Sequence, residues 1–554
     1  MAISLIRDAA AQDLLGDPHF LAQWVQLYRA CPWASACQSP GFVTAWHGAY
    51  KDRYSPFIVS EHSPAGDLVG LLSLARDKAS GQLIVAGARQ AEYKTWLALP
   101  SNGSSFIEGA LTELACKTDV SALSLRYLPP GTPTDWIARF AKRSARCQLQ
   151  RHPRPIIPVG DTATVTEYLQ KKRSGKSVRN SFNRLKRIGD LSLDEIRDAD
   201  QLQPIFDQLI TFYDIRQGGA HGKFAFQQDL AKKPFHLALL QTPGLLHLTV
   251  LRAGPEILSA QFGISDGKVF SGTMPILSPF HAAHSPMQVH LLMLVEKLHQ
   301  DGYSIFDLTA SMDPFKERFV GSYDSVCSLS VYFRHRIRHQ VFQASQALAR
   351  RSLRSLRIEP HAALEQLQNL ARVPIKTWPS VLARNSFALL KKPLSETKFK
   401  IYEILPKQVP PVEGVLKMSR DHLADLLAFQ PTEAWLTRHR FLAAALKRIE
   451  AGDHFYTHVE NGRLLHISWL IEDQRSNIFP EIGRKFPFPP GAAVLFGSYT
   501  DPEWRRHRLW WSALQQMLHD LVQNPRVSHI FTAVPAANQP ARHVIEKAGF
   551  VNVS

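Results

Sequence analysis

Residues 500–511 read TDPEWRRHRLWW, and they connect an apolar, strand-like segment at 492–499 to a helix-like segment at 509–522. A loop that leads from a strand into a helix offers backbone N–H groups where the helix dipole favours negative charge. The backbone around Arg505–Trp510 is therefore placed to receive an anion.

The segments around this loop alternate between strand and helix patterns. Strands are predicted at 454–460, 464–471, 492–499 and 528–533, with the helix at 509–522 between the last two. Residues 538–550, NQPARHVIEKAGF, then predict a further helix and a turn. This order is typical of an α/β domain that starts near residue 415.

The two quoted stretches resemble the GNAT superfamily of acetyltransferases. In that family a strand splays from its neighbour, and a loop of the form R-x-x-G-x-G/A receives the pyrophosphate of acetyl-CoA. The chain departs from the pattern: Arg508 and Trp510 replace small residues, and Ile545 stands where many members carry a tyrosine general acid. The resemblance implies acetyl-CoA, or another acyl-CoA, as co-substrate. It implies these cofactor-binding residues: Arg505, Arg506, Arg508, Trp510 and Asn538.

The middle of the chain also has an α/β order. A helix is expected from Thr164 and carries the basic run KKRSGKSVRNSFNRLKR at 171–187. Strands are predicted at 245–251, 256–264 and 268–274, followed by a helix at 288–299 and a strand at 304–308.

This region, from about residue 20 to 325, resembles the CelD/BcsL-type acetyltransferases of cellulose and exopolysaccharide synthesis. The family is distantly related to enzymes that transfer amino acids from aminoacyl-tRNA to peptidoglycan. The markers are Ser39-Pro-Gly-Phe with Trp46, Ala91-Glu-Tyr93, the basic helix at Arg173–Leu185, Arg216 before Gly218-Gly219 and Phe224, Ser259-Ala260, Ser285-Pro286, Phe306-Asp307-Leu308 and Asp313-Pro-Phe-Lys316.

The resemblance gives these residues expected roles. Ser285 is expected to cap the helix that follows it and, with Met287, to contact the cofactor, although Met287 replaces the glycine that the family pattern has there. Asp307 is expected at a strand end and is equally interpreted as a cap or as an ion-pair partner of Lys316 or Arg318. The predicted catalytic residues are Asp307, Asp313 and Lys316, which would position an acceptor and take its proton. The predicted substrate-binding residues are Arg173 and Arg216, and a surface salt bridge is the alternative for Arg216.

The expected architecture is α/β (α+β), with tandem GNAT-like domains whose mixed central sheets are flanked by helices. We expect an N-terminal GNAT-like half at 1–155, where the proline-rich passage 151–158 marks a boundary, and a CelD/BcsL-type domain at 156–332. A basic helical and proline-rich connector at 333–414 then leads to a C-terminal GNAT domain at 415–554.

Composition limits the location and the partners. The formal charge of +17 indicates an anionic partner, without specific DNA binding. The basic helices permit a contact with tRNA or an anionic membrane surface, and a solvated helix face with an apolar underside is the alternative for them. Five cysteines without CxxC spacing indicate free thiols. The N-terminus lacks a secretory signal pattern, so we expect a cytoplasmic protein that can lie at the inner membrane surface.

Other reaction classes are disfavoured. Ser174-Gly-Lys-Ser177 lacks the first glycine and the preceding strand of a phosphate-binding P-loop. His281 and His284 lack the glutamate of a zinc-protease helix, so no metal is expected.

Transfer of an acetyl group to an amine or hydroxyl of a saccharide or related polar acceptor, in exopolysaccharide or cell-envelope biosynthesis, is therefore the leading hypothesis. Two alternatives stay open: an aminoacyl-tRNA-dependent (Fem-like) aminoacyl transferase, and a non-catalytic GNAT-fold scaffold at a polysaccharide synthase.

Overall fold

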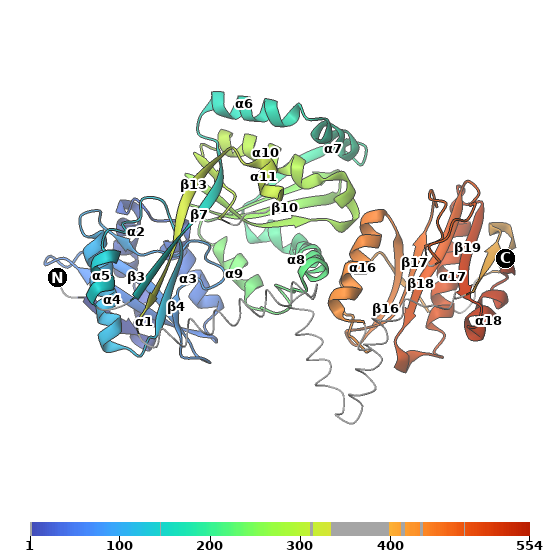
Figure 1. Cartoon of the computed structure of the whole chain (residues 1–554), viewed down its shortest axis with the longest axis horizontal. Coiled ribbons are helices and arrows are strands. Elements are labelled where there is room, and N and C mark those ends of the chain that lie inside the picture. The colour runs from blue at the N-terminus through green and yellow to red at the C-terminus, as the bar shows by residue number, and fades with distance from the viewer. Residues whose placement is uncertain are drawn as a thin grey trace. The chain divides into compact units, whose positions relative to one another are not determined.

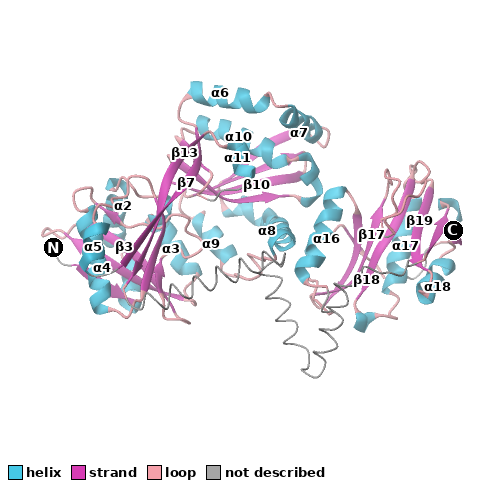
Figure 2. Ribbon diagram, in the orientation of Figure 1, coloured by secondary structure: helices cyan, strands magenta, loops and turns pink. Residues whose placement is uncertain are grey.

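The structure is a computed structural model that describes residues 3–143, 146–310, 314–333, 398–411, 416–432, 436–480 and 482–553. Among these residues the chain forms two compact units. The first is drawn from Met1–Leu209, Phe226–Ser278 and His284–Ala349, and the second from Ile210–Ala225, Pro279–Ala283 and Arg350–Ser554. Figure 1 shows the element order, and Figure 2 shows strands in magenta with helices packed against them.

The first unit begins with an antiparallel sheet in the order β1-β2-β3-β4, with β5 paired to β3. Its strands are β1 (Ile3–Arg7), β2 (Tyr54–His62), β3 (Leu68–Asp77), β4 (Leu83–Val85) and β5 (Leu97–Ala98). The helices beside it are α1 (Asp8–Gly16), α2 (Pro18–Ala30), α3 (Pro40–Ala49), α4 (Gly103–Lys117) and α5 (Ile137–Arg143). Buried Trp24, Trp46 and Trp96 fill its core, because aromatic side chains bury large apolar areas.

A second, mixed sheet of eight strands completes this unit, in the order β6-β13-β7-β12-β11-β10-β9-β8. Its strands are β6 (Ala122–Leu128), β7 (Arg146–Pro158), β8 (Leu191–Ile196), β9 (Leu246–Ala253), β10 (Glu256–Ser265), β11 (Val269–Leu277), β12 (Ile305–Asp307) and β13 (Ser322–Tyr332). The remaining helices of this part of the chain are α6 (Thr162–Arg173), α7 (Lys176–Lys186), α8 (Ala199–His221), α9 (Lys232–Leu239), α10 (Pro286–Gln300) and α11 (Pro314–Phe319). Apolar residues of α6, α7 and α10 form one core cluster with β12.

Two sequence expectations change here. The proline-rich passage 151–158 lies inside β7, so the boundary expected at residue 155 falls within a strand. On the side of β7 that faces β12, only Ile156–Pro158 have a strand partner. Pro153 and Pro155 precede this paired segment, and a proline, which has no N–H to donate to a ladder, is tolerated there. The single basic helix is also divided, since α6 ends at Arg173 and α7 starts at Lys176, after Gly175.

The third sheet lies in the second unit and is also mixed, in the order β15-β16-β17-β18-β19-β14-β20. Its strands are β14 (Phe399–Ile404), β15 (Ser419–Arg420), β16 (His454–Glu460), β17 (Arg463–Ile471), β18 (Ala492–Thr500), β19 (His529–Pro535) and β20 (Val551–Asn552). The helices are α15 (Leu423–Leu427), α16 (Arg438–Ala451), α17 (Leu509–Val522) and α18 (Gln539–Lys547). β14 joins this sheet although it precedes residue 415. Most of the basic helical and proline-rich connector expected at 333–414 lies outside the described residues.

The core of the second unit forms between α17 and one face of the sheet. Leu470, Leu495 and Leu514 are buried there together with Ile545 and Phe550. The predicted α/β architecture of sheets flanked by helices is confirmed, because β11–β12 and β18–β19 are parallel pairs that α10 and α17 connect. Among the described helices, none is both long and apolar enough to cross a bilayer.

Candidate functional site

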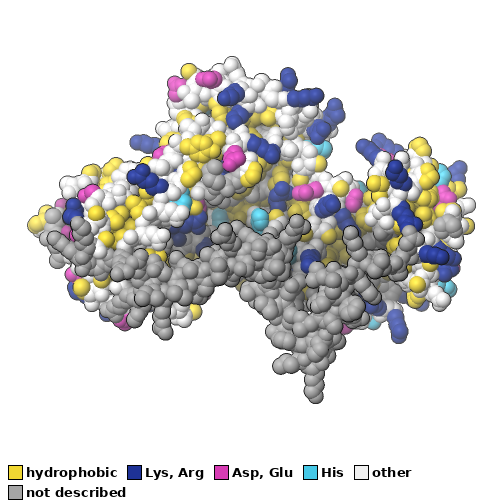
Figure 3. Space-filling model, in the orientation of Figure 1, with side chains coloured by type: hydrophobic (Ala, Val, Ile, Leu, Met, Phe, Trp, Pro, Cys, Tyr) yellow, Lys and Arg dark blue, Asp and Glu magenta, His cyan; other side chains and the backbone are white. Residues whose placement is uncertain are grey.

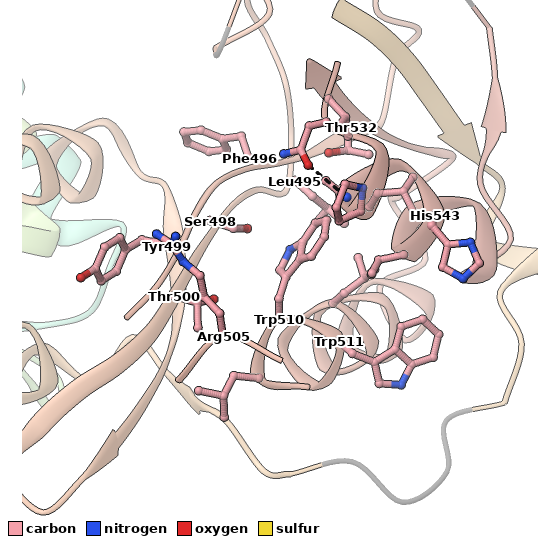
Figure 4. Close-up of a pocket in the computed structure, with 18 of the residues that line it drawn as sticks. Leu495, Phe496, Ser498, Tyr499, Thr500, Arg505, Trp510, Trp511, Thr532 and His543 are labelled. Atoms are coloured by element: carbon pink, nitrogen blue, oxygen red, sulfur yellow. Dashed lines mark hydrogen bonds between the residues drawn. The ribbon is translucent and has the colours of Figure 1, made fainter. Parts of the chain in front are cut away.

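A cavity of about 1030 Å³ lies where β18 and β19 separate. These parallel neighbours pair only through Ala492–Leu495 and His529–Thr532. Beyond this pairing the strands splay, and side chains of β18, β19, α17 and α18 line the space between them (Figure 4). The cavity is therefore open to a ligand between two strands, directly in front of the N-terminus of α17.

A buried ion pair holds the loop that connects β18 to α17. Asp501 is 1% exposed, and its Oδ2 atom accepts hydrogen bonds from Arg463 Nε at 2.9 Å and lies 2.8 Å from Arg463 Nη2. Its Oδ1 atom accepts from the backbone N–H of Glu503 at 3.1 Å. Because β17 carries Arg463, the ion pair fixes the start of the loop to the sheet.

The end of this loop adopts the backbone conformation that a glycine of the R-x-x-G-x-G/A motif adopts most easily. Arg508, the N-cap of α17, has φ of 59° and ψ of 14°, and Arg506 has φ of 76°. Both arginines occupy the left-handed region, which favours glycine because side chains are strained there. The Arg508 side chain makes no cap hydrogen bond, so the first N–H groups of α17 have no partner from the cap.

The cofactor-binding residues predicted near the C-terminus come together at this cavity. Its lining contains Arg505, Arg506, Arg508, Trp510 and Asn538. The indole of Trp510 projects between Thr500 and Arg505 on one side and Thr532 and His543 on the other (Figure 4). Asn538 caps α18, because its Oδ1 atom accepts from the N–H of Ala541 at 3.2 Å.

Two further cavity residues escaped sequence analysis. His543 and Lys547 lie one turn apart on α18 and line the cavity. Their spacing of four on a predicted helix was the available signal. Lys547 adds its positive charge to that of the loop arginines in the lining. Ile545, which stands at the family's tyrosine position, is 1% exposed and belongs to the core.

In the first unit Asp307 lies at the end of β12 with its side chain fully buried. Its carboxylate accepts hydrogen bonds from the Tyr93 hydroxyl, from Ser271 Oγ at 3.2 Å and from the N–H of Thr309 at 2.7 Å. Arg154 Nη1 lies 3.7 Å away. Burial raises the pKa of Asp307, and the Arg154 guanidinium opposes this rise. Asp307 is thus an ion-pair partner, as the alternative interpretation supposed. Its partner is Arg154 rather than Lys316 or Arg318.

The other predicted residues of the middle region lie in different surroundings. Lys316 Nζ donates to Thr309 Oγ1 at 3.0 Å, which brings it near Asp307, whereas Asp313 lies outside the described residues. Arg173 Nη2 donates to Glu296 Oε2 at 2.8 Å. Arg216, in the segment assigned to the second unit, donates from Nη1 to Glu450 Oε1 at 2.9 Å, as the salt-bridge alternative supposed.

The expected cap by Ser285 is wrong. Ser285 is the N-cap of α10 but has φ of 53° and ψ of 50°, and its side chain makes no cap hydrogen bond. A capping serine needs an extended backbone to direct its hydroxyl to the helix N–H groups, which the left-handed conformation prevents. Met287 is 6% exposed and packs in the core cluster of α10.

Several features of the cavity suit an anionic ligand. It combines splayed parallel strands, a left-handed loop, a helix N-terminus and basic side chains. In the part of the chain that the structure describes, no three His, Cys, Asp or Glu side chains are placed to hold a metal ion.

Comparisons with known families identify the class of the protein. The acetyltransferase (GNAT) family matches residues 420–550, and an acetyltransferase (GNAT) domain family matches residues 171–317. The protein is thus an acyltransferase. It belongs to the GNAT superfamily and carries two domains of that type.

Solved structures with similar chains include FemX, at 12% identity and a TM-score of 0.41, covering 58% of this chain and 98% of that one. A tandem GNAT protein of clavulanic acid biosynthesis is 13% identical with a TM-score of 0.36, covering 60% and 99%. The L-PGS of Bacillus licheniformis is 13% identical with a TM-score of 0.38, covering 60% and 97%. No curated protein sequence matches the chain.

Proposed function

We propose that the second unit binds acetyl-CoA in the cavity between β18 and β19 and transfers its acetyl group to an amine or hydroxyl of a saccharide. The observation that carries this proposal is the cavity itself, which joins a splayed strand pair to a basic helix N-terminus. The pyrophosphate would lie at the first turn of α17, near Arg505, Arg506 and Arg508. The acetyl thioester would reach between the strands.

Bound acetyl-CoA supplies an activated acyl group, and the chain's own residues orient it. The N-terminal N–H groups of α17 and the guanidinium groups of the loop would hold the phosphates. The walls of β18 and β19 would exclude water from the thioester. The CelD/BcsL resemblance supports a saccharide acceptor from exopolysaccharide or cell-envelope synthesis, and the roles predicted for Asp307, Asp313 and Lys316 stay predictions.

Arg508→Gly tests the cofactor site. Arg508 already has a backbone conformation that glycine adopts freely, so the substitution removes the side chain without redirecting the loop. If the guanidinium contacts a phosphate, we expect acetyl-CoA affinity to fall by about tenfold, as for the loss of one charged hydrogen bond. Titration calorimetry with acetyl-CoA on the full chain measures this.

Asn461→Gly is the matched control, because Asn461 also has a positive φ, of 51°, but lies in the β16–β17 turn. It should leave the affinity unchanged. Tighter binding by Arg508→Gly would show that the side chain obstructs the cofactor, and no binding by the unaltered protein would refute the acetyl-CoA site.

A second candidate function, aminoacyl transfer from aminoacyl-tRNA, has its support in the first unit. Helix α7 buries Leu185 and exposes Lys176, Arg179, Arg184 and Lys186. Figure 3 shows Lys and Arg side chains gathered over α6 and α7. We expect that reversing the charge of Arg179 and Arg184 to Glu weakens binding of deacylated tRNA and reduces its salt dependence, in a filter-binding titration. Binding that neither the substitutions nor salt affects would exclude this function for α7.

A further inference from the structure

A chain of hydrogen-bonding side chains connects two points on the wall of the second unit's cavity through a buried histidine. His466 Nδ1 lies 2.8 Å from Thr500 Oγ1, and His466 Nε2 lies 2.8 Å from Ser468 Oγ. Ser468 Oγ in turn lies 2.8 Å from Ser498 Oγ. The order is therefore Thr500, His466, Ser468, Ser498.

Strand register brings these four residues together. His466 and Ser468 alternate on β17, and Ser498 and Thr500 alternate on β18, so each pair lies on one face of its strand. His466 stands opposite Thr500 in the ladder, and the ladder shifts between Ile467 and Trp469. His466 and Ser468 are fully buried, whereas Ser498 and Thr500 line the cavity. Only the two ends of the chain of side chains are thus available to a ligand.

The imidazole of His466 sets which group donates and which accepts in each hydrogen bond of this series. Burial, and secondarily the nearby His458, lowers the pKa of His466 to about 3, so the ring is neutral near pH 7. A neutral imidazole has one N–H donor and one nitrogen acceptor. When Nδ1 carries the proton, Ser468 donates to Nε2 and Ser498 donates to Ser468. Ser498 then presents only an acceptor to the cavity, and Thr500 presents its O–H.

We propose that His466 relays a proton between Ser498 and Thr500 during acyl transfer in this cavity. The proposal rests on the proposed function of the second unit. In the relay, Ser498 and Thr500 are the groups that touch the reactants, and His466 acts through them. A relay suits a buried ring, because a proton that passes through never leaves a charged imidazolium in an apolar interior.

The transfer step balances as follows. The acceptor nitrogen forms a bond to the acyl carbon, and the C–S bond breaks with its electron pair on the departing thiolate. The nitrogen's proton moves to Ser498 Oγ, the Ser498 proton to Ser468, and the Ser468 proton to His466 Nε2. The Nδ1 proton moves to Thr500 Oγ1, and Thr500 releases its own proton to solvent. His466 ends as the other neutral tautomer, and the thiolate takes a proton from solvent.

His466→Gln on the full-length protein tests the relay. The glutamine amide offers one donor and one acceptor side but does not exchange a proton between them. We expect acetyl-CoA affinity in calorimetry and the melting temperature to be retained. Thiol release from acetyl-CoA, with glucosamine, lysine and spermidine as amine probes, should fall by about 100-fold. The proton inventory in mixed H₂O and D₂O should change from several protons in flight to one, which a purely structural role would not produce.

Ser498→Ala and Thr500→Val remove the ends of the relay at positions that line the cavity, so they carry the test if His466→Gln does not fold. His519→Gln, on the exposed side of α17, is the matched control and should match the unaltered protein. Turnover of His466→Gln within threefold of the unaltered protein, or loss of its acetyl-CoA binding, would overturn the relay alone. No thiol release by the unaltered protein with any probe would overturn the proposed function together with the relay.

Discussion

Asp307→Asn is expected to lower the unfolding free energy of the first unit by about 3 kcal/mol. The buried carboxylate accepts from Tyr93, Ser271 and Thr309 and faces Arg154. An asparagine amide would place a donor against these donors, and the guanidinium of Arg154 offers no acceptor in return. Amide hydrogen exchange in β7 and β12, measured on the full chain, reports this loss locally.

Asp324→Asn is the matched control because it contacts the same arginine. Asp324 Oδ2 lies 2.8 Å from Arg154 Nη2 but its side chain is 35% exposed, so we expect a loss below about 1 kcal/mol. If Asp307→Asn instead leaves hydrogen exchange unchanged and reduces turnover by about 100-fold, the predicted catalytic role of Asp307 is supported and the stabilising role is refuted.

Asp501→Asn is expected to destabilise the second unit by about 3 kcal/mol and to weaken acetyl-CoA binding by at least tenfold. The first effect follows because Arg463 would lose a charged partner that is 1% exposed. The second follows because the same ion pair fixes the loop that carries Arg505, Arg506 and Arg508 to β17. Calorimetry gives the affinity, and hydrogen exchange at 502–508 gives the local order of the loop.

Glu503→Gln separates the buried from the exposed partner of the same arginine. Arg463 Nη1 donates to Glu503 Oε2 at 2.8 Å, yet the Glu503 side chain is 71% exposed, so its loss should cost well under 1 kcal/mol. Equal effects of the two substitutions would show that overall charge, rather than the buried contact, positions the loop.

The local pattern of the sequence predicted most helices and strands around the second site. The helix expected at 509–522 is confirmed by α17, and the strand expected at 454–460 is confirmed by β16. These elements have uninterrupted periodicity, which depends only on residues close in sequence. The prediction was wrong where local signals conflict with tertiary pairing, because the prolines of 151–158 indicate a boundary while β7 uses the same residues in a strand.

Some features of the candidate site were also predictable from local sequence, and others were not. Arg505, Arg506, Arg508, Trp510 and Asn538 were identified from a motif, since the loop and the cap of α18 are local features. The left-handed backbone at Ser285 and the consequent loss of its cap were not accessible, because φ at a non-glycine residue is set by tertiary packing rather than by the residue type.

The sequence by itself thus determined the superfamily and the two α/β regions, and it predicted the loop that we propose as a phosphate site. It did so because a loop before a helix is built from consecutive residues, whose order is the motif. Only the tertiary structure decided the partners of buried polar groups. Arg154 reaches Asp307 from another strand of the sheet, and His466 reaches Thr500 across the β17–β18 ladder. Such pairs follow from strand register and topology, which bring together residues that no local pattern relates.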